Sequence, residues 1–302
     1  MPPETRCFMT DYPPLPLPNT TDHRPRRVGV EIEFAGLSQQ AVVACTQDIL
    51  GGRVAGETAT EVVVADTELG DIRIELDTRL TKFDHLPGAR AVLDVARTVV
   101  PVEIVTQPLL PTDMPRMDAL CGCLRDHGAR GSRDGMLYGF GVHLNPEVIA
   151  PDHPHTCATI MAYALLEPTL RKEMHLDPMR RLLPFVDPWP PEFVDALRQL
   201  NRPPLNAIAQ LYAGHITSRN HGLDLLPLFF AALPEASANL FAGVKSQARP
   251  TFHFRLPESR IDEAGWTLRD AWAQWHAVET LAQEPARLAE LIEEMAPAHG
   301  DP

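Results

Sequence analysis

The segment Val28-Gly29-Val30-Glu31-Ile32-Glu33-Phe34 alternates apolar and polar side chains along most of its length. In a β-strand successive side chains point to opposite faces, so Val30 and Ile32 share one face while Glu31 and Glu33 share the other. The apolar face predicts packing against helices. The two carboxylates leave the opposite face polar, so the segment predicts a sheet with one buried side and one open side.

Further segments continue this pattern along the chain. Strands are predicted at Glu61–Asp66, Asp71–Asp77, Val102–Thr106, Met136–Asn145 and Thr251–Leu256. Helices are predicted at about 38–49, 88–99, 113–127 and 262–294, and the region of about 150–248 is expected to be mainly helical. Short alternating strands separated by helical segments predict an α+β fold.

Composition narrows the class of protein. The chain has 302 residues, of which 44% are hydrophobic, and a formal charge of -13. Nucleic-acid binding depends on clustered Lys and Arg, so we expect no nucleic-acid partner. The longest apolar stretches fall short of the ~20 residues needed to span a bilayer, so we expect no membrane insertion. Five cysteines without framework spacing and the absence of a leader pattern favour a reducing cytoplasm.

One cysteine motif has the residue types of a metal site. Cys121-Gly122-Cys123 followed by His127 has the residue types of half a zinc site. The sequence offers no second Cys/His pair at a matching spacing. The motif alone therefore does not predict a zinc site.

The polar faces of the predicted strands share an unusual composition, rich in carboxylates and imidazoles. Their members are Glu31, Glu33, Glu75, Glu103, His143, Asn145, His253 and Arg255. Solvated strand faces usually carry Lys, Thr and Ser, whereas oxygen and imidazole donors bind divalent metals. Four carboxylates on one sheet would repel one another unless cations neutralised them. The set therefore predicts a metal site, although His253 and Arg255 also fit a buried hydrogen-bonded pair.

Other catalytic layouts find less support. The sequence contains no Walker-type loop, no His-Glu-x-x-His, no Gly-x-Ser-x-Gly and no dinucleotide fingerprint. Glu31 and Glu33 are a pair of acids of the kind that glycoside hydrolysis uses. Neighbours on one strand face lie roughly 7 Å apart and point in parallel, which suits joint metal binding better than flanking a sugar bond.

Four segments, in this order, together resemble the amidoligase family, which is related to glutamine synthetase and glutamate-cysteine ligase. They are Arg27–Phe34, Glu103–Leu109, Gly141–Asn145 and Phe252–Arg255. The resemblance extends from about Arg27 to Arg260. It implies a curved antiparallel sheet of about five to six strands with helices packed on one face, like the catalytic domains of those ligases. It also implies a single amidoligase-like catalytic domain over 27–296. The proline run Pro13–Pro18 predicts an extended Pro-rich arm over residues 1–26, and residues 297–302 are expected to form a flexible tail.

The resemblance further implies ATP and two or three Mg²⁺ or Mn²⁺ ions on the concave face. The metal ligands would be Glu31, Glu33, Glu75, Glu103, His143 and, where the related synthetases carry Glu-x-Arg, His253. Histidine can replace glutamate as a metal ligand, but it brings no negative charge to that position. Arg255 would contact the transferring phosphate, with Glu31 and Glu103 as further catalytic groups. Lys245, Arg249 and Asn145 are the other expected nucleotide contacts, and Arg133 and Arg219 the expected contacts for a substrate carboxylate.

The implied reaction joins a carboxylate to an amine at the expense of ATP. The expected partners are a small-molecule or peptide carboxylate and an amine donor, and the sequence leaves a homo-oligomer open. Two other functions fit the same residues. One is a non-catalytic member that binds a peptide or partner protein, and the other is a metal-dependent hydrolase that activates water.

Overall fold

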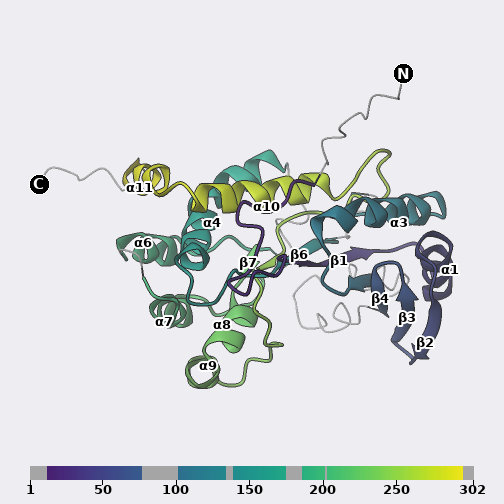
Figure 1. The fold of residues 1–302 in the computed structure, drawn as a ribbon, viewed down its shortest axis with the longest axis horizontal. Helices are drawn as coiled ribbons and strands as arrows, with labels where there is room; N and C mark the ends of the chain where they lie inside the picture. The colour runs from purple at the N-terminus through teal and green to yellow at the C-terminus, as the bar shows by residue number, and fades with distance from the viewer. Residues whose placement is uncertain (1–11, 77–100, 134–138, 175–185, 201–202, 295–302) are drawn as a thin grey trace, which may run out of the picture.

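The structure is a computed structural model that describes residues 12–76, 101–133, 139–174, 186–200 and 203–294. Within these ranges eight strands form one antiparallel sheet in the order β2-β3-β4-β5-β1-β6-β8-β7 (Figure 1). The strands are β1 Val28–Phe34, β2 Arg53–Glu57, β3 Glu61–Thr67, β4 Gly70–Leu76, β5 Val102–Thr106, β6 Val142–Pro146, β7 Leu223–Asp224 and β8 His253–Phe254. The first predicted strand, β1, lies inside the sheet between β5 and β6.

Nine α-helices occur among the described residues. They are α1 Gln39–Leu50, α3 Met114–Asp126, α4 Pro154–Glu173, α6 Pro191–Gln199, α7 Leu205–His215, α8 Leu226–Ala232, α9 Pro234–Leu240, α10 Arg269–Ala282 and α11 Pro285–Glu294. Helices α1, α3, α4 and α10 lie along one side of the sheet, while α6 to α9 gather near its β7 end (Figure 1). None of the described helices is long and apolar enough to cross a membrane.

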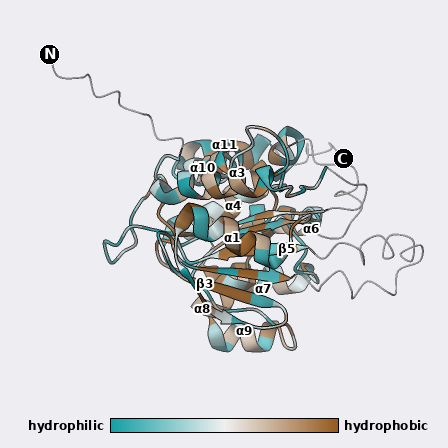
Figure 2. Cartoon of the chain, turned by 90° about the vertical axis from the view of Figure 1, so that its right-hand side faces the viewer, coloured by the Kyte–Doolittle hydropathy of each residue, from teal (hydrophilic) through white to brown (hydrophobic). Residues whose placement is uncertain are grey.

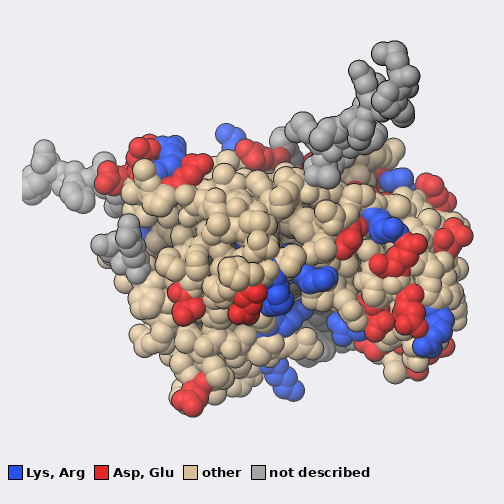
Figure 3. All heavy atoms as spheres, viewed as in Figure 1, with Lys and Arg blue, Asp and Glu red and all other residues tan. Residues whose placement is uncertain are grey.

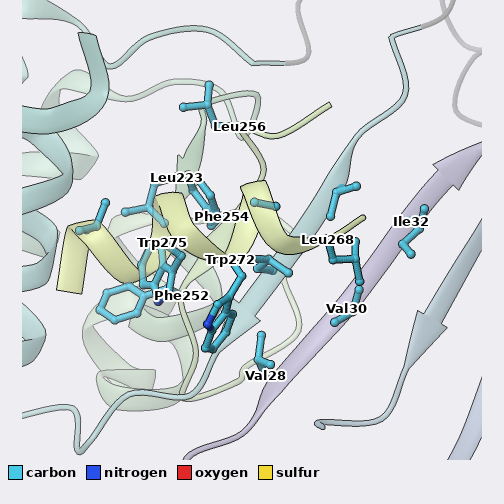
Figure 4. Close-up of a cluster of buried hydrophobic side chains, with 14 of the residues drawn as sticks. Val28, Val30, Ile32, Leu223, Phe252, Phe254, Leu256, Leu268, Trp272 and Trp275 are labelled. Carbon is cyan, nitrogen blue, oxygen red and sulfur yellow. The ribbon is translucent and has the colours of Figure 1, made fainter. Parts of the chain in front are cut away.

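The alternation in β1 is confirmed by burial. Val28, Val30, Ile32 and Phe34 are fully buried, while Glu31 and Glu33 on the other face are partly exposed. The buried face packs against a hydrophobic cluster that includes Trp272 and Trp275 of α10 (Figure 4). Both hydrophobic and hydrophilic segments occur along the strands in Figure 2. One face of the sheet therefore stabilises the fold and leaves the other for polar groups.

The expected count of five to six strands is too low, because β2 and β7 were not anticipated. All five residues of β2 are exposed, so its sequence has no buried face to produce alternation. β7 is only two residues long. Two predicted strands are also shorter than expected: β6 begins at Val142 and β8 covers only His253–Phe254, while residues 136–138 lie outside the described ranges.

The prediction of one long closing helix over 262–294 is wrong, because this region forms a loop followed by two helices, α10 and α11. Gly265 adopts a φ of 79°, in the left-handed region that a helix interior excludes. Pro285 begins α11, where its missing N–H is tolerated and its ring ends α10 upstream. The helix expected at 38–49 is confirmed by α1, whose N-cap Ser38 accepts a hydrogen bond from the Ala41 N–H. The helix expected at 88–99 lies outside the described residues.

Residues 12–26 pack against the helical layer. The Tyr12 hydroxyl donates to Asp118 of α3 at 2.6 Å, and the Trp272 indole donates to the Pro13 carbonyl at 2.9 Å. At the end of this segment the Arg26 guanidinium forms two hydrogen bonds, of 2.6 and 2.7 Å, with Glu279 of α10. Both side chains are almost completely buried. Burial would raise the pKa of Glu279, but hydrogen bonds from His155 and Arg26 hold it below its usual value of 4.5.

Glu279→Gln should destabilise the protein by about 3–5 kcal/mol at neutral pH, because it leaves the Arg26 charge buried without its counter-charge. Urea unfolding measures this loss. Glu290→Gln is the control, because it removes only an exposed ion pair with Arg287 and should change stability little. Equal, small effects from both variants would show that the buried pair does not hold residues 12–26 in place.

The same pair predicts a pH dependence of stability. The folded pKa of Glu279 lies below the unfolded one, so its contribution is complete above the usual value of 4.5 and is lost as pH falls from there through the folded pKa. Urea unfolding between neutral pH and pH ~3 should therefore show a smaller acid-induced loss in Glu279→Gln than in the wild type. Parallel pH profiles for the two proteins would contradict this assignment.

Candidate functional site

Strand register brings the acids of the polar face together. Glu33 of β1 pairs with Glu103 of β5, and Glu103 pairs in turn with Glu75 of β4. On the other side of β1, Glu31 pairs with His143 of β6. Directly paired residues of antiparallel strands project to the same face, so these groups form one cluster across four strands.

His143 lies at the centre of this cluster. Its Nδ1 is 2.9 Å from Glu31 Oε2 and 3.9 Å from Glu103 Oε1, and its Nε2 is 3.9 Å from Glu33 Oε1. The His143 side chain is 4% exposed, and the three carboxylates are 11–13% exposed. Charges so shielded from water interact more strongly than surface charges do.

Asn145 and His253 extend the cluster toward β8. The Asn145 amide donates from Nδ2 to Glu31 Oε1 at 2.9 Å, so its Oδ1 accepts from His253 Nδ1 at 2.6 Å. A neutral imidazole protonated at Nδ1 has a bare Nε2, which can bind a metal. The His143 and His253 rings lie edge to face, with centroids 5.2 Å apart. His253 is therefore part of the cluster.

Two groups in the cluster have shifted pKa values. Burial would raise the pKa of Glu31, but the hydrogen bond from His143 and the nearby charge of Arg249 hold it well below its usual range. Burial also lowers the pKa of His253, despite the opposing effect of Glu31. Glu31 is thus an anion and His253 a neutral base at neutral pH, the protonation states in which both bind metals.

The donor set fits divalent cations. Within this cluster, ligand atoms lie within 4.8 Å of one another in two groups: Glu31, His143 and His253, and Glu33, Glu103 and His143. Carboxylate oxygens suit Mg²⁺ and Mn²⁺, while imidazole nitrogens are ligands for transition metals. The two groups share His143, so cations bound here would lie close together.

The predicted cationic residues are divided between the cluster and its surroundings. Arg249 reaches the cluster, with its Nη1 3.6 Å from Glu31 Oε1. Arg255 follows β8, and its Nη1 donates to the Arg219 carbonyl at 2.7 Å. Lys245 is exposed in the loop after α9, and its carbonyl accepts a hydrogen bond from Arg219.

The remaining predicted residues have other partners. Arg219 pairs with the buried Asp224 at 2.8 Å. Arg133 pairs with Glu258 at 3.4 Å and Glu263 at 3.5 Å. Each arginine therefore contacts acids of this chain. Glu75 has an ion pair with Arg73 at 3.5 Å and belongs to neither metal-ligand group.

A cleft of about 360 Å³ adjoins Glu31, Asn145 and Arg249 on the polar face. It is lined further by Asp71, Arg73, Gln107, Gln247 and Thr251. Strand alternation predicts that Arg73 lies on the same face as Glu75, but neither Arg73 nor Asp71 is among the predicted site residues. Basic side chains gather beside acidic ones in the middle of the view in Figure 3. The cleft thus offers groups of both charges next to the metal-ligand groups.

Comparison with known proteins places these strands in a family of enzymes. Residues 24–277 match the family described as "Putative amidoligase enzyme", a range that includes every strand of the sheet. The chain belongs to this amidoligase family, which confirms the resemblance seen in the sequence. No curated protein and no solved structure matches the chain.

If the cluster binds metal, Glu33→Gln and Glu103→Gln should each weaken Mn²⁺ binding by at least about tenfold, since loss of even an outer partner of a metal site has that effect. Electron paramagnetic resonance of free Mn²⁺ measures the affinity. Glu61→Gln is a matched control, because Glu61 pairs with Glu75 on the same sheet but lies outside both groups. Equal affinities in all four proteins would place the Mn²⁺ site elsewhere.

Proposed function

We propose that this protein is an ATP-dependent carboxylate–amine ligase that uses Mg²⁺ or Mn²⁺ and forms an amide through an acyl phosphate. The observation that carries the proposal is the pair of metal-ligand groups sharing His143 on the polar face. Membership of the amidoligase family and the adjoining cleft support it. The proposal includes a sheet of the glutamine synthetase and glutamate-cysteine ligase type.

In this proposal Glu31, Glu33, Glu103, His143 and His253 hold the cations. Bound divalent ions would neutralise charge on the ATP phosphates and on the oxygens of the transferred group. Asn145 keeps Glu31 and His253 in position, because it hydrogen-bonds to both. The chain thus provides the anionic side of the site before any nucleotide binds.

The proposed reaction has two steps. A carboxylate oxygen of the substrate attacks the γ-phosphorus of ATP, the bond from that phosphorus to the β–γ bridging oxygen breaks, and ADP leaves. The amine then attacks the acyl carbon and the carbon–oxygen bond to phosphate breaks. Inorganic phosphate leaves, and the amine nitrogen loses a proton to solvent. The products are an amide, ADP and phosphate.

Positive charge beside the cluster would bind the phosphates. Arg249 already contacts Glu31 and lines the cleft, so it can reach a nucleotide there. Arg255 is proposed to contact the transferred phosphoryl group, because it lies two residues from His253. Lys245 remains a proposed phosphate contact. Arg133 and Arg219 would have to leave their acidic partners to bind a substrate carboxylate.

The cleft accommodates a small molecule or the end of a peptide. Its volume of about 360 Å³ lies within the range of ligand pockets. Arg73 and Arg249 offer positive charge to a carboxylate, and Asp71 offers negative charge to an amine. These groups support a small-molecule or peptide carboxylate and an amine donor as substrates.

Isothermal titration calorimetry with a non-hydrolysable ATP analogue tests the proposal. The wild type should bind the analogue only with Mg²⁺ present, and Glu31→Gln/Glu33→Gln should weaken binding at least about tenfold, because the phosphates would lose their bridging cations. Glu147→Gln is the control, since Glu147 follows β6, pairs with Arg24 and belongs to neither metal-ligand group.

Binding of the nucleotide analogue without metal would contradict the ligase proposal. So would the absence of any nucleotide binding by the folded wild type. Metal binding without nucleotide would favour the hydrolase. If the protein binds a peptide or partner protein and loss of the Glu31 carboxylate leaves that binding unchanged, the non-catalytic alternative is favoured. Release of ADP that requires both a carboxylate and an amine would complete the case for the ligase.

A further inference from the structure

A second group of metal-binding side chains lies between helices α1 and α3. It consists of Cys45 of α1, Cys123 of α3 and His127 directly after α3, whose ligand atoms lie within 4.8 Å of one another. The two helices pack against each other on the apolar side of the sheet, and α1 also contacts β3 and β4. The group is therefore separated from the Glu31–His143 cluster by the sheet itself.

Of the two cysteines in the motif Cys121-Gly122-Cys123, only Cys123 belongs to this metal-binding group. Cys121 is fully buried in the core and belongs to none of the metal-binding groups among the described residues. Cys123 lies two residues further along α3, on a different side of the helix, and faces Cys45 instead. Cys45 is 78 positions before Cys123 in the sequence, so spacing cannot reveal the site.

We propose that Cys45, Cys123 and His127 bind one Zn²⁺ ion between α1 and α3. Two sulfurs and one imidazole nitrogen are the donors that zinc prefers. Tetrahedral zinc, with Zn–S of about 2.3 Å and Zn–N of about 2.0–2.1 Å, places sulfur and nitrogen roughly 3.6 Å apart. Cys123 Sγ and His127 Nδ1 are 3.7 Å apart.

The local hydrogen bonds allow His127 Nδ1 to bind zinc in place of its present hydrogen-bond partner. Without metal, His127 Nδ1 donates to the Cys123 carbonyl at 2.8 Å. Binding zinc through Nδ1 would end that bond, but the carbonyl would still accept the His127 backbone N–H, now at 3.1 Å. The carbonyl would therefore keep a partner at the end of the helix.

The three proposed ligands differ in exposure to solvent, so a zinc ion can reach the site from the exposed side. Cys45 is buried, Cys123 is half-buried and His127 is exposed, so an ion would enter from the His127 side and a water molecule would complete the tetrahedron. Burial, together with the hydrogen bond to Cys123 and the charges of Cys123 and Asp48, raises the pKa of the Cys45 thiol to about 12. Zinc binding would release the protons of both thiols to solvent, leaving two thiolates on the metal.

The probe for this site is Co²⁺, added to the reduced, metal-free full-length protein, because thiolate ligands give it a sulfur-to-metal charge-transfer absorption that carboxylates do not. We expect one equivalent of Co²⁺ to produce this band and Zn²⁺ to abolish it. Cys123→Ser and His127→Ala should each weaken binding at least about tenfold. Both residues are partly or fully exposed, so folding should survive, and circular dichroism verifies it.

Two controls separate this site from the rest of the molecule. Cys157→Ser removes a half-buried thiol of α4 outside the group and should leave the band unchanged. Glu33→Gln, in the other cluster, should also leave it unchanged. Absence of a thiolate band in the wild type, or an undiminished band in both Cys123→Ser and His127→Ala, would overturn the proposal.

Discussion

Charge repulsion among carboxylates on one face of the sheet is the constraint on which the rest of this structure depends. Glu31, Glu33 and Glu103 lie around His143 with little exposure to water, and strand register prevents them from moving apart. Hydrogen bonds from His143 and Asn145 and the charge of Arg249 offset part of the repulsion. Divalent cations would neutralise the negative charge that remains, so this arrangement favours metal binding.

The opposite face of the sheet provides the stability that such a cluster requires. Val30, Ile32 and Phe34 of β1 are fully buried there, next to the residues that form the cluster. The helices above are joined to residues 12–26 by the buried pair of Arg26 and Glu279. Apolar burial on one side of β1 therefore holds the acids of the other side at fixed distances, as a preorganised site needs.

Strand alternation made much of this predictable, because one residue pattern determines both the buried face and the polar face. Glu31, Glu33, Glu103, His143 and His253 were all predicted as metal ligands, and the structure brings them together. β2 was missed because an exposed strand has no apolar face to mark it. The contacts of Arg249 and Cys45 were missed because both depend on packing between segments far apart in the sequence, which periodicity does not record.

The most direct test is a crystal structure with Mn²⁺ and a non-hydrolysable ATP analogue, using anomalous scattering to locate the metal. We predict manganese peaks about 2.0–2.3 Å from carboxylate oxygens of Glu33 and Glu103 and from a His143 nitrogen, with the phosphates of the analogue on the same ions. Clear density for manganese and nucleotide away from the polar face, with this cluster still joined by its own hydrogen bonds, would contradict the account.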